Sequence, residues 1–143
     1  MRSAYLDGEL HALGPDGVPT FSRLQTAMDE RRIDALVFMA FDLLFLDGES
    51  TAKLPLIERK ERLRLLLEPE VRGVRFADHV VGNGPRFRER ACKLGVEGVV
   101  SKRVDYDYAS GARSLWLKFK CAESNDGLAR SSDAAHPKEG EAR

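Results

Sequence analysis

Two lysines near the end of the last apolar segment are spaced for binding an anion. The residues of Trp116–Lys120 alternate, so a β-strand there would place Lys118 and Lys120 side by side on one face. Two ammonium groups held that close repel each other unless an anion lies between them. The pattern therefore indicates a phosphate-binding strand. An ordinary solvated strand face is the alternative interpretation.

Carboxylates occur at two other places in the same kind of pattern. Asp7 and Glu9 share one face of an alternating segment, and Glu97 opens a short run of β-branched residues. Carboxylates beside a phosphate site hold a hard cation such as Mg²⁺ or Mn²⁺, or accept a hydrogen bond from a ribose hydroxyl. Taken singly, each of these carboxylates fits a surface charge better than a ligand.

The elements that would position these residues follow from hydrophobic periodicity and from turn residues. Residues 35–46 are almost continuously apolar, which is typical of a strand at the centre of the core. The expected strands are Ala4–Ala12 and residues 35–46, 74–81, 97–102 and 116–120. Helices are expected from about Thr20, from Pro55 to about Leu67, and between Gly84 and Gly95.

Composition sets the class of protein. The 143 residues carry 23 Lys and Arg against 23 Asp and Glu, so an anion site must be local. No segment is long and apolar enough for a membrane span or a signal peptide, and we expect a cytoplasmic protein with no membrane partner.

Cys92 and Cys121 lack the spacing of a zinc site, and we expect two buried or idle thiols rather than a disulfide. Residues 122–143 are expected to form a disordered tail.

Four segments resemble, in order, motifs of the covalent nucleotidyltransferase superfamily, and within it the ATP-dependent DNA ligases of the bacterial type. Leu6-Asp7-Gly8-Glu9 resembles the third motif, and Phe41-Asp42-Leu43-Leu44-Phe45-Leu46-Asp47-Gly48 resembles the motif after it. Glu97-Gly98-Val99-Val100-Ser101-Lys102 resembles the fourth motif and Trp116-Leu117-Lys118-Phe119-Lys120 the fifth. Each string alone is weak evidence, but four in this order seldom arise by chance.

The resemblance implies a fold and a set of cofactors. The fold would be α+β, an ATP-grasp-like nucleotidyltransferase core of antiparallel sheets flanked by helices. It would occupy residues 1–121 as a partial adenylation domain, incomplete at the N-terminus. The cofactors would be ATP and Mg²⁺ or Mn²⁺.

The resemblance also implies residue roles. Glu9 would reach the ribose, Phe41 would stack on adenine, and Lys118 and Lys120 would hold the α-phosphate, whereas Glu97 would assist the metal. Two further assignments are weaker, namely Lys102 as a nucleotide contact and Arg113 as a contact to nucleotide or DNA. In a regular strand Lys102 falls on the face opposite Glu97. Either the strand ends before Lys102, or these two residues do not share one pocket.

The first motif of the family, Lys-x-Asp-Gly, supplies the lysine that becomes adenylated. None of the seven lysines in this sequence is followed by x-Asp-Gly. We therefore expect a ligase fragment that is inactive alone. Its full-length parent would seal nicked duplex DNA, and an upstream segment or a partner chain would supply the lysine. The alternatives are a non-catalytic nucleotide- or DNA-binding remnant, and an RNA ligase or capping-type enzyme.

Overall fold

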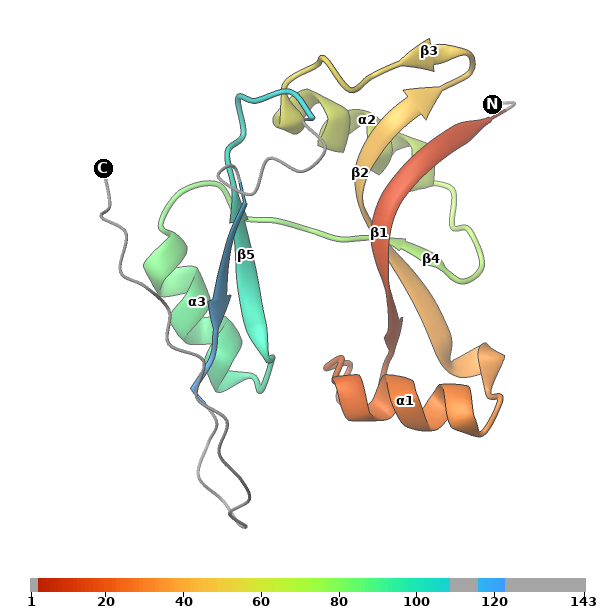
Figure 1. The fold of residues 1–143 in the computed structure, drawn as a ribbon, viewed down its shortest axis with the longest axis vertical. Coiled ribbons are helices and arrows are strands. Elements are labelled where there is room, and N and C mark those ends of the chain that lie inside the picture. Colours follow the sequence, from red (N-terminus) through yellow and green to blue (C-terminus); the bar gives the residue numbers. More distant parts are fainter. Residues whose placement is uncertain (1–2, 109–115, 123–143) are drawn as a thin grey trace.

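The computed structural model describes residues 3–108 and 116–122 and has the α+β architecture expected from the sequence (Figure 1). Strands from two separate sheets alternate with helices along the chain. In chain order the elements are β1 (Ala4–Ala12), α1 (Phe21–Asp29), a 3₁₀ turn (Ile33–Ala35), β2 (Leu36–Leu46), β3 (Glu49–Ser50), α2 (Leu56–Leu67), β4 (Val74–Phe76), α3 (Gly84–Lys93), β5 (Gly98–Lys102) and β6 (Trp116–Lys120).

The larger sheet is built around β2. Strand β1 pairs antiparallel with β2 over its whole length. Strand β3 pairs with the last two residues of β2, and β4 pairs with residues 38–40 of β2. The β2–β4 pair is parallel, so the sheet is not purely antiparallel. The strand predicted over residues 74–81 ends at Phe76 instead. After Ala77, whose N–H donates to the Ala40 carbonyl at 2.8 Å, the chain leaves the sheet.

Helix α2 covers one face of this sheet. The fully buried residues Ala40 and Leu43 of β2 pack with Leu63 of α2, and partly buried side chains of both sheet and helix surround them. Leu56 and Leu63 lie two helical turns apart on the inward side of α2, as the sequence predicts. This apolar contact between β2 and α2 is the hydrophobic core of the described residues.

A buried ion pair crosses the same interface. The Arg59 guanidinium of α2 donates to the Asp42 carboxylate of β2 through Nε at 2.7 Å and through its second terminal nitrogen at 2.9 Å. Asp42 has no role predicted from the sequence beyond its place in a motif. In the structure its side chain is fully buried and its charge is matched.

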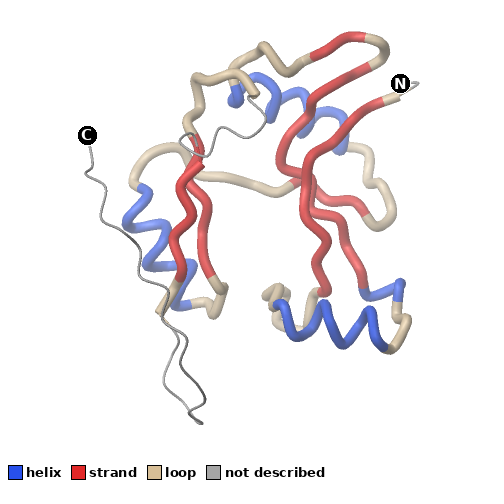
Figure 2. Tube along the Cα trace, in the orientation of Figure 1, coloured by secondary structure: helices blue, strands red, loops and turns tan. Residues whose placement is uncertain are grey.

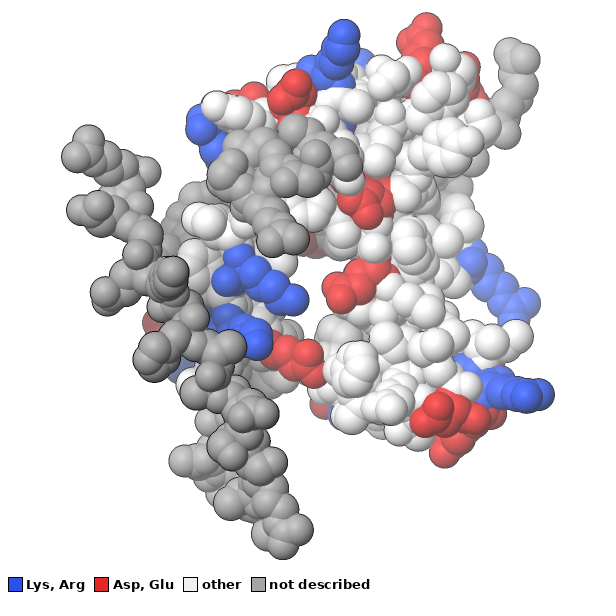
Figure 3. All heavy atoms as spheres, viewed as in Figure 1, with Lys and Arg blue, Asp and Glu red and all other residues white. Residues whose placement is uncertain are grey.

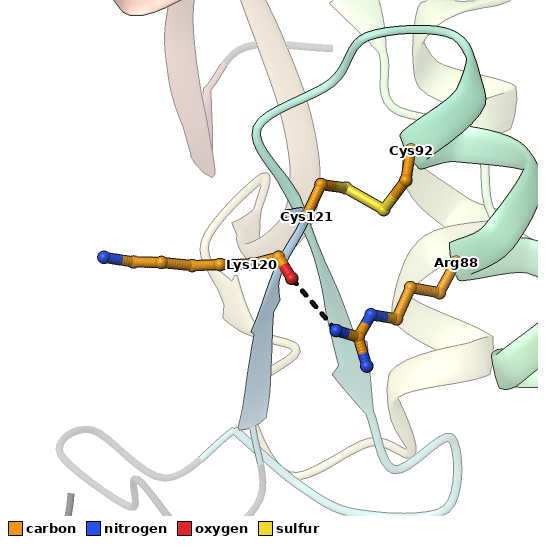
Figure 4. Close-up of a disulfide and its surroundings, with 4 residues drawn as sticks. All are labelled: Arg88, Cys92, Lys120 and Cys121. Atoms are coloured by element: carbon orange, nitrogen blue, oxygen red, sulfur yellow. Dashed lines mark hydrogen bonds between the residues drawn. A yellow bond between two sulfur atoms is a disulfide. The ribbon is translucent and has the colours of Figure 1, made fainter. Parts of the chain in front are cut away.

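The smaller sheet consists of β5 and β6, paired antiparallel, with α3 packed on β5 (Figure 2). A disulfide joins Cys92 of α3 to Cys121 immediately after β6, and Arg88 of α3 donates to the Lys120 carbonyl at 3.0 Å (Figure 4). The prediction of two idle thiols is therefore wrong. The cysteines lie 29 residues apart without a recognisable spacing, and only the antiparallel return of β6 along β5 brings them together.

Among residues 3–108 and 116–122, no helix has the length and apolar character needed to cross a membrane. The predicted tail over residues 122–143 falls almost entirely outside the described residues, as does the predicted Arg113 contact.

Candidate functional site

A cleft of about 870 Å³ lies between the two sheets. One wall comes from β1 and β2, the other from β5, β6 and α3, and the connection between β4 and α3 closes part of the cleft. Figure 3 shows the hollow, with basic side chains on its β5–β6 side and acidic side chains on its β1 side. Four residues singled out by sequence line this one cleft: Glu9, Phe41, Lys102 and Lys118.

Phe41 lies at an irregularity in the pairing of β1 and β2. Asp7 faces Asp42 and Gly8 faces Ala40, so Phe41 is left without a partner in β1. Such a β-bulge adds one residue to a strand and interrupts its pairing locally. Ala40 and Asp42, on either side of Phe41, are completely buried, whereas the Phe41 ring lines the cleft. The β2 strand therefore presents an aromatic face to the cleft, on the side opposite the buried Ala40 and Asp42.

Lys102 lies against this ring. Its Nζ is 3.8 Å from the centroid of Phe41 and 4.0 Å from the centroid of Trp116. Burial lowers the pKa of Lys102, and the nearby carboxylates of Asp42 and Asp7 oppose that effect. The β5 strand continues through Lys102, so the strand does not end before this residue. Lys102 lines the cleft and Glu97 does not, and these two residues therefore do not share one pocket.

Tyr108 completes an aromatic cluster with Phe41 and Trp116. Its ring packs edge-on to that of Trp116 at a centroid distance of 6.2 Å. The Tyr108 hydroxyl donates to Asp7 Oδ2 at 3.1 Å, and burial, reinforced by the Asp7 charge, raises the pKa of Tyr108. Asp7 thus holds this cluster in place, whereas the neighbouring carboxylate of Glu9 is exposed and lies 3.1 Å from His11 Nε2.

Lys118 and Lys120 occupy the strand face that sequence analysis predicts. Lys118 lines the cleft opposite Val100 of β5 in the strand register. Lys120 is two residues further on, and its side chain extends away from α3 and from the disulfide (Figure 4). Both lysines are exposed. The β6 strand therefore directs two unburied ammonium groups away from α3, with that of Lys118 at the cleft.

Glu97 lies elsewhere. Its Oε1 accepts a hydrogen bond of 2.9 Å from the backbone N–H of Phe21, the first residue of α1. A carboxylate at a helix N-terminus is favoured by the helix dipole and by the free N–H groups there. Glu97 therefore connects the smaller sheet to α1. In the described parts of the chain, no group of three or more His, Cys, Asp or Glu side chains is placed to hold a metal ion.

A buried cation in the cleft, Lys60, is not among the residues predicted from the sequence. Lys60 of α2 is 7% exposed, its Nζ donates to the Ala77 carbonyl at 2.7 Å, and the ammonium lies 4.8 Å from the centroid of Phe76. Burial lowers the pKa of Lys60 from 10.5 to about 8, and the positive charge of Lys102 adds to the effect. Its place in the sequence indicates its burial, because Lys60 follows the buried Leu56 by four residues and so lies one helical turn further along the same side of α2.

The two sheets, the helices around them and the cleft between the sheets give the described residues an α+β fold with room for a ligand. The profile of the family described as "ATP dependent DNA ligase domain" matches residues 1–120. The chain belongs to this family.

Relatives of known type agree with this assignment. The chain is 37% identical to the multifunctional non-homologous end joining protein LigD of Pseudomonas aeruginosa, over 85% of this chain and 14% of the relative. It is 38% identical to the LigD protein of Mycolicibacterium smegmatis, over 80% of this chain and 15% of the relative. The chain thus spans about a seventh of the length of these relatives.

A solved structure confirms the fold. The chain superposes on mycobacterial DNA ligase D complexed with ATP and MES with a TM-score of 0.68 and 34% identity. The matched part covers 82% of this chain and 38% of that one. The described residues therefore have the fold of part of a ligase domain.

Proposed function

We propose that this chain provides the nucleotide-holding part of an ATP-dependent DNA ligase. One observation supports the proposal most strongly: in a chain of this family, one cleft brings together an aromatic face at Phe41, an exposed carboxylate at Glu9 and an exposed ammonium at Lys118. An aromatic face, a hydrogen-bond acceptor and a cation suit the base, the ribose and the phosphates of ATP respectively. The solved relative complexed with ATP is consistent with this ligand.

In the proposed site, each residue acts on a different part of ATP. The base stacks on Phe41 and a ribose hydroxyl donates to Glu9. Lys118 and Lys120 attract the phosphates and stabilise the negative charge that builds up on them during transfer. This arrangement fixes the α-phosphate near β6. The side of the α-phosphate from which a nucleophile attacks stays unobstructed in this arrangement.

The proposed metal is Mg²⁺ or Mn²⁺, which would offset phosphate charge. Mg²⁺ binds through one or two carboxylates together with substrate phosphates and water. The absence of a three-ligand cluster among the described residues fits this mode better than a preformed protein site. Glu97 is the proposed carboxylate, and because it does not line the cleft in this structure, its side chain would have to turn from the Phe21 N–H toward the phosphates for this role.

The covalent step needs a lysine that this sequence does not contain in the required motif. An upstream segment or a partner chain would supply it. The lysine nitrogen bonds to the α-phosphorus, the bond from that phosphorus to the bridging oxygen breaks, pyrophosphate leaves, and the lysine gives its proton to solvent. AMP then passes to the 5′-phosphate of nicked duplex DNA. Attack by the 3′-hydroxyl closes the nick and releases AMP.

The emission of Trp116, the single tryptophan and part of the cleft wall, provides the test. Titration with ATP and Mg²⁺ is expected to change this emission saturably, and Lys118→Ala to weaken binding about tenfold. Lys53→Ala, at an exposed lysine that does not line the cleft, serves as control and is expected to bind as the unmodified chain does. An unmodified chain that does not bind ATP would contradict the proposal.

A second measurement tests the location of the nucleophile. After incubation with α-labelled ATP and Mg²⁺, a denaturing gel is expected to show no label on this chain. Label that survives denaturation would show that one of its own lysines becomes adenylated.

Binding without catalysis is a second candidate function, favoured by the same lack of Lys-x-Asp-Gly in this sequence. The two candidates differ in what the gene encodes upstream. An in-frame Lys-x-Asp-Gly before the Met1 codon supports the ligase. A partner that carries the motif and becomes labelled in the presence of this chain supports it equally.

A further inference from the structure

The ammonium group of Lys102 covers the aromatic surface of Phe41. Its Nζ lies 3.8 Å from the Phe41 centroid and 4.0 Å from that of Trp116, and the two ring centroids are 6.3 Å apart with an interplanar angle of 87°. Cations within about 6 Å of a ring centroid are attracted by the negative face of the ring. The cation therefore sits in the corner formed by two nearly perpendicular rings.

The contacts that hold Lys102 in this corner are few. Within residues 3–108 and 116–122, no carboxylate lies within ion-pair distance of its Nζ, although Asp42 and Asp7 are near enough to attract it. Arg59, which is paired with Asp42, repels it, and burial disfavours the charged form. Ring faces and distant carboxylates thus keep the ammonium in place without a direct ion pair. A ligand can displace a group held in this way.

We propose that Lys102 is a specificity-determining residue of the nucleotide site, because its ammonium occupies the Phe41 face on which a base would stack. This inference rests on the proposed function. A base that enters the cleft must move the ammonium off the ring. ATP offsets this loss, because its phosphates offer the displaced ammonium a new anionic partner at the β6 side of the cleft. Adenosine has no phosphate and offers none.

The proposal predicts that removing Lys102 changes the affinities for the two ligands differently. Lys102→Ala opens the ring face, and adenosine is expected to bind about three- to tenfold more tightly, the range of a partly buried cation–π contact. ATP is expected to gain nothing, because the same substitution removes a cation that its phosphates would attract. Calorimetric titration of each ligand measures both affinities without relying on Trp116, whose surroundings change in the variant.

Two variants make the comparison specific. Lys93→Ala removes an exposed lysine of α3 that is paired with Glu89, and both affinities are expected to stay unchanged. Lys102→Met keeps most of the side-chain stem without the charge, and replaces Lys102→Ala if that variant unfolds. A purely structural role of Lys102 would shift adenosine and ATP affinities by the same factor.

The outcomes separate this inference from the proposed function. If the unmodified chain binds ATP but Lys102→Ala binds adenosine no more tightly than the unmodified chain does, the inference about Lys102 is wrong and the proposed function stands. If the unmodified chain binds neither ligand, the proposed function fails and the inference fails with it. A selective gain for adenosine supports both.

Discussion

The Arg59 guanidinium and the Asp42 carboxylate face each other with almost no access to solvent, their side chains being 3% and 0% exposed. Arg59 also donates to the Tyr106 carbonyl at 3.1 Å, beyond the end of β5. One buried cation therefore connects β2, α2 and the segment that leads to Tyr108. The ion pair holds the back of the cleft wall on which Phe41 lies.

Removal of the guanidinium is expected to destabilise the fold strongly. Arg59→Met leaves the Asp42 carboxylate buried without a partner, which costs about 3–5 kcal/mol in comparable buried pairs. Arg62→Ala on the same helix breaks only an exposed pair with Glu58, and is expected to cost at most about 1 kcal/mol. Urea unfolding followed by circular dichroism measures both. Equal losses for the two variants would show that the buried pair has no special role.

Lys60 makes stability depend on pH in a defined direction. The folded chain releases the Lys60 proton near pH 8, whereas the unfolded chain holds it until about 10.5. Between these values the unfolded state binds more protons, so the free energy of unfolding rises with pH. We expect the unmodified chain to gain stability relative to Lys60→Met from pH 8 to 10.5, measured by urea unfolding at several pH values. Parallel curves for the two proteins would contradict the lowered pKa of Lys60.

The Cys92–Cys121 disulfide is expected to stabilise the chain substantially. It joins two residues with a sequence separation of 29, and loss of such a cross-link from the unfolded chain costs roughly 3–4 kcal/mol in the chain-entropy account. Denaturant unfolding with and without reductant measures this difference. The double variant Cys92→Ser/Cys121→Ser serves as control, and its stability should not respond to reductant. An unmodified chain that is equally insensitive would show that the cross-link does not form.

Gly98 permits the close approach of β5 and β6. A Cβ at this position would lie 2.5 Å from the Phe119 carbonyl oxygen, a backbone atom that cannot move aside without opening the strand pair. Gly98→Ala is expected to cost about 1–3 kcal/mol, as overpacking typically does. At Gly84 an added Cβ meets nothing within 4 Å, so Gly84→Ala is the control. Thermal unfolding compares the two variants, and a similar Tm for both would contradict the close approach.

Hydrophobic alternation and capping residues predicted the bounds of those strands and helices whose packing follows the same pattern. Strands β1 and β6 have the predicted bounds, and Thr20 caps α1 as expected, its hydroxyl accepting from the Arg23 N–H at 3.3 Å. Strand β4 is shorter than the strand predicted over residues 74–81 because only residues 74–76 pair with β2. Apolar sequence can predict an extended conformation, but it does not specify where a partner strand ends.

Of the residues chosen from the sequence, Glu9, Phe41, Lys102 and Lys118 line one cleft in the structure, whereas Glu97 does not. Alternation in β6 places Lys118 and Lys120 on one face, and alternation in β2 places Phe41 opposite the buried Ala40 and Asp42, whereas the bulge that leaves Phe41 unpaired has no local signal. The Arg59–Asp42 pair had a detectable signal, because a lone Asp in an apolar strand requires a buried partner. Arg59 lies between Leu56 and Leu63 on the inward side of α2, where such a partner belongs.

The disulfide also changes the covalent connectivity of the molecule. Residues 92–121 form a closed ring, so a break in the backbone anywhere between Cys92 and Cys121 yields two peptides that remain joined through sulfur. The strand that carries Lys118 and Lys120 is thus linked to α3 by two independent covalent routes. A chain nicked inside this ring would keep β6 attached to the rest of the protein, and would separate into two bands only on a reducing gel.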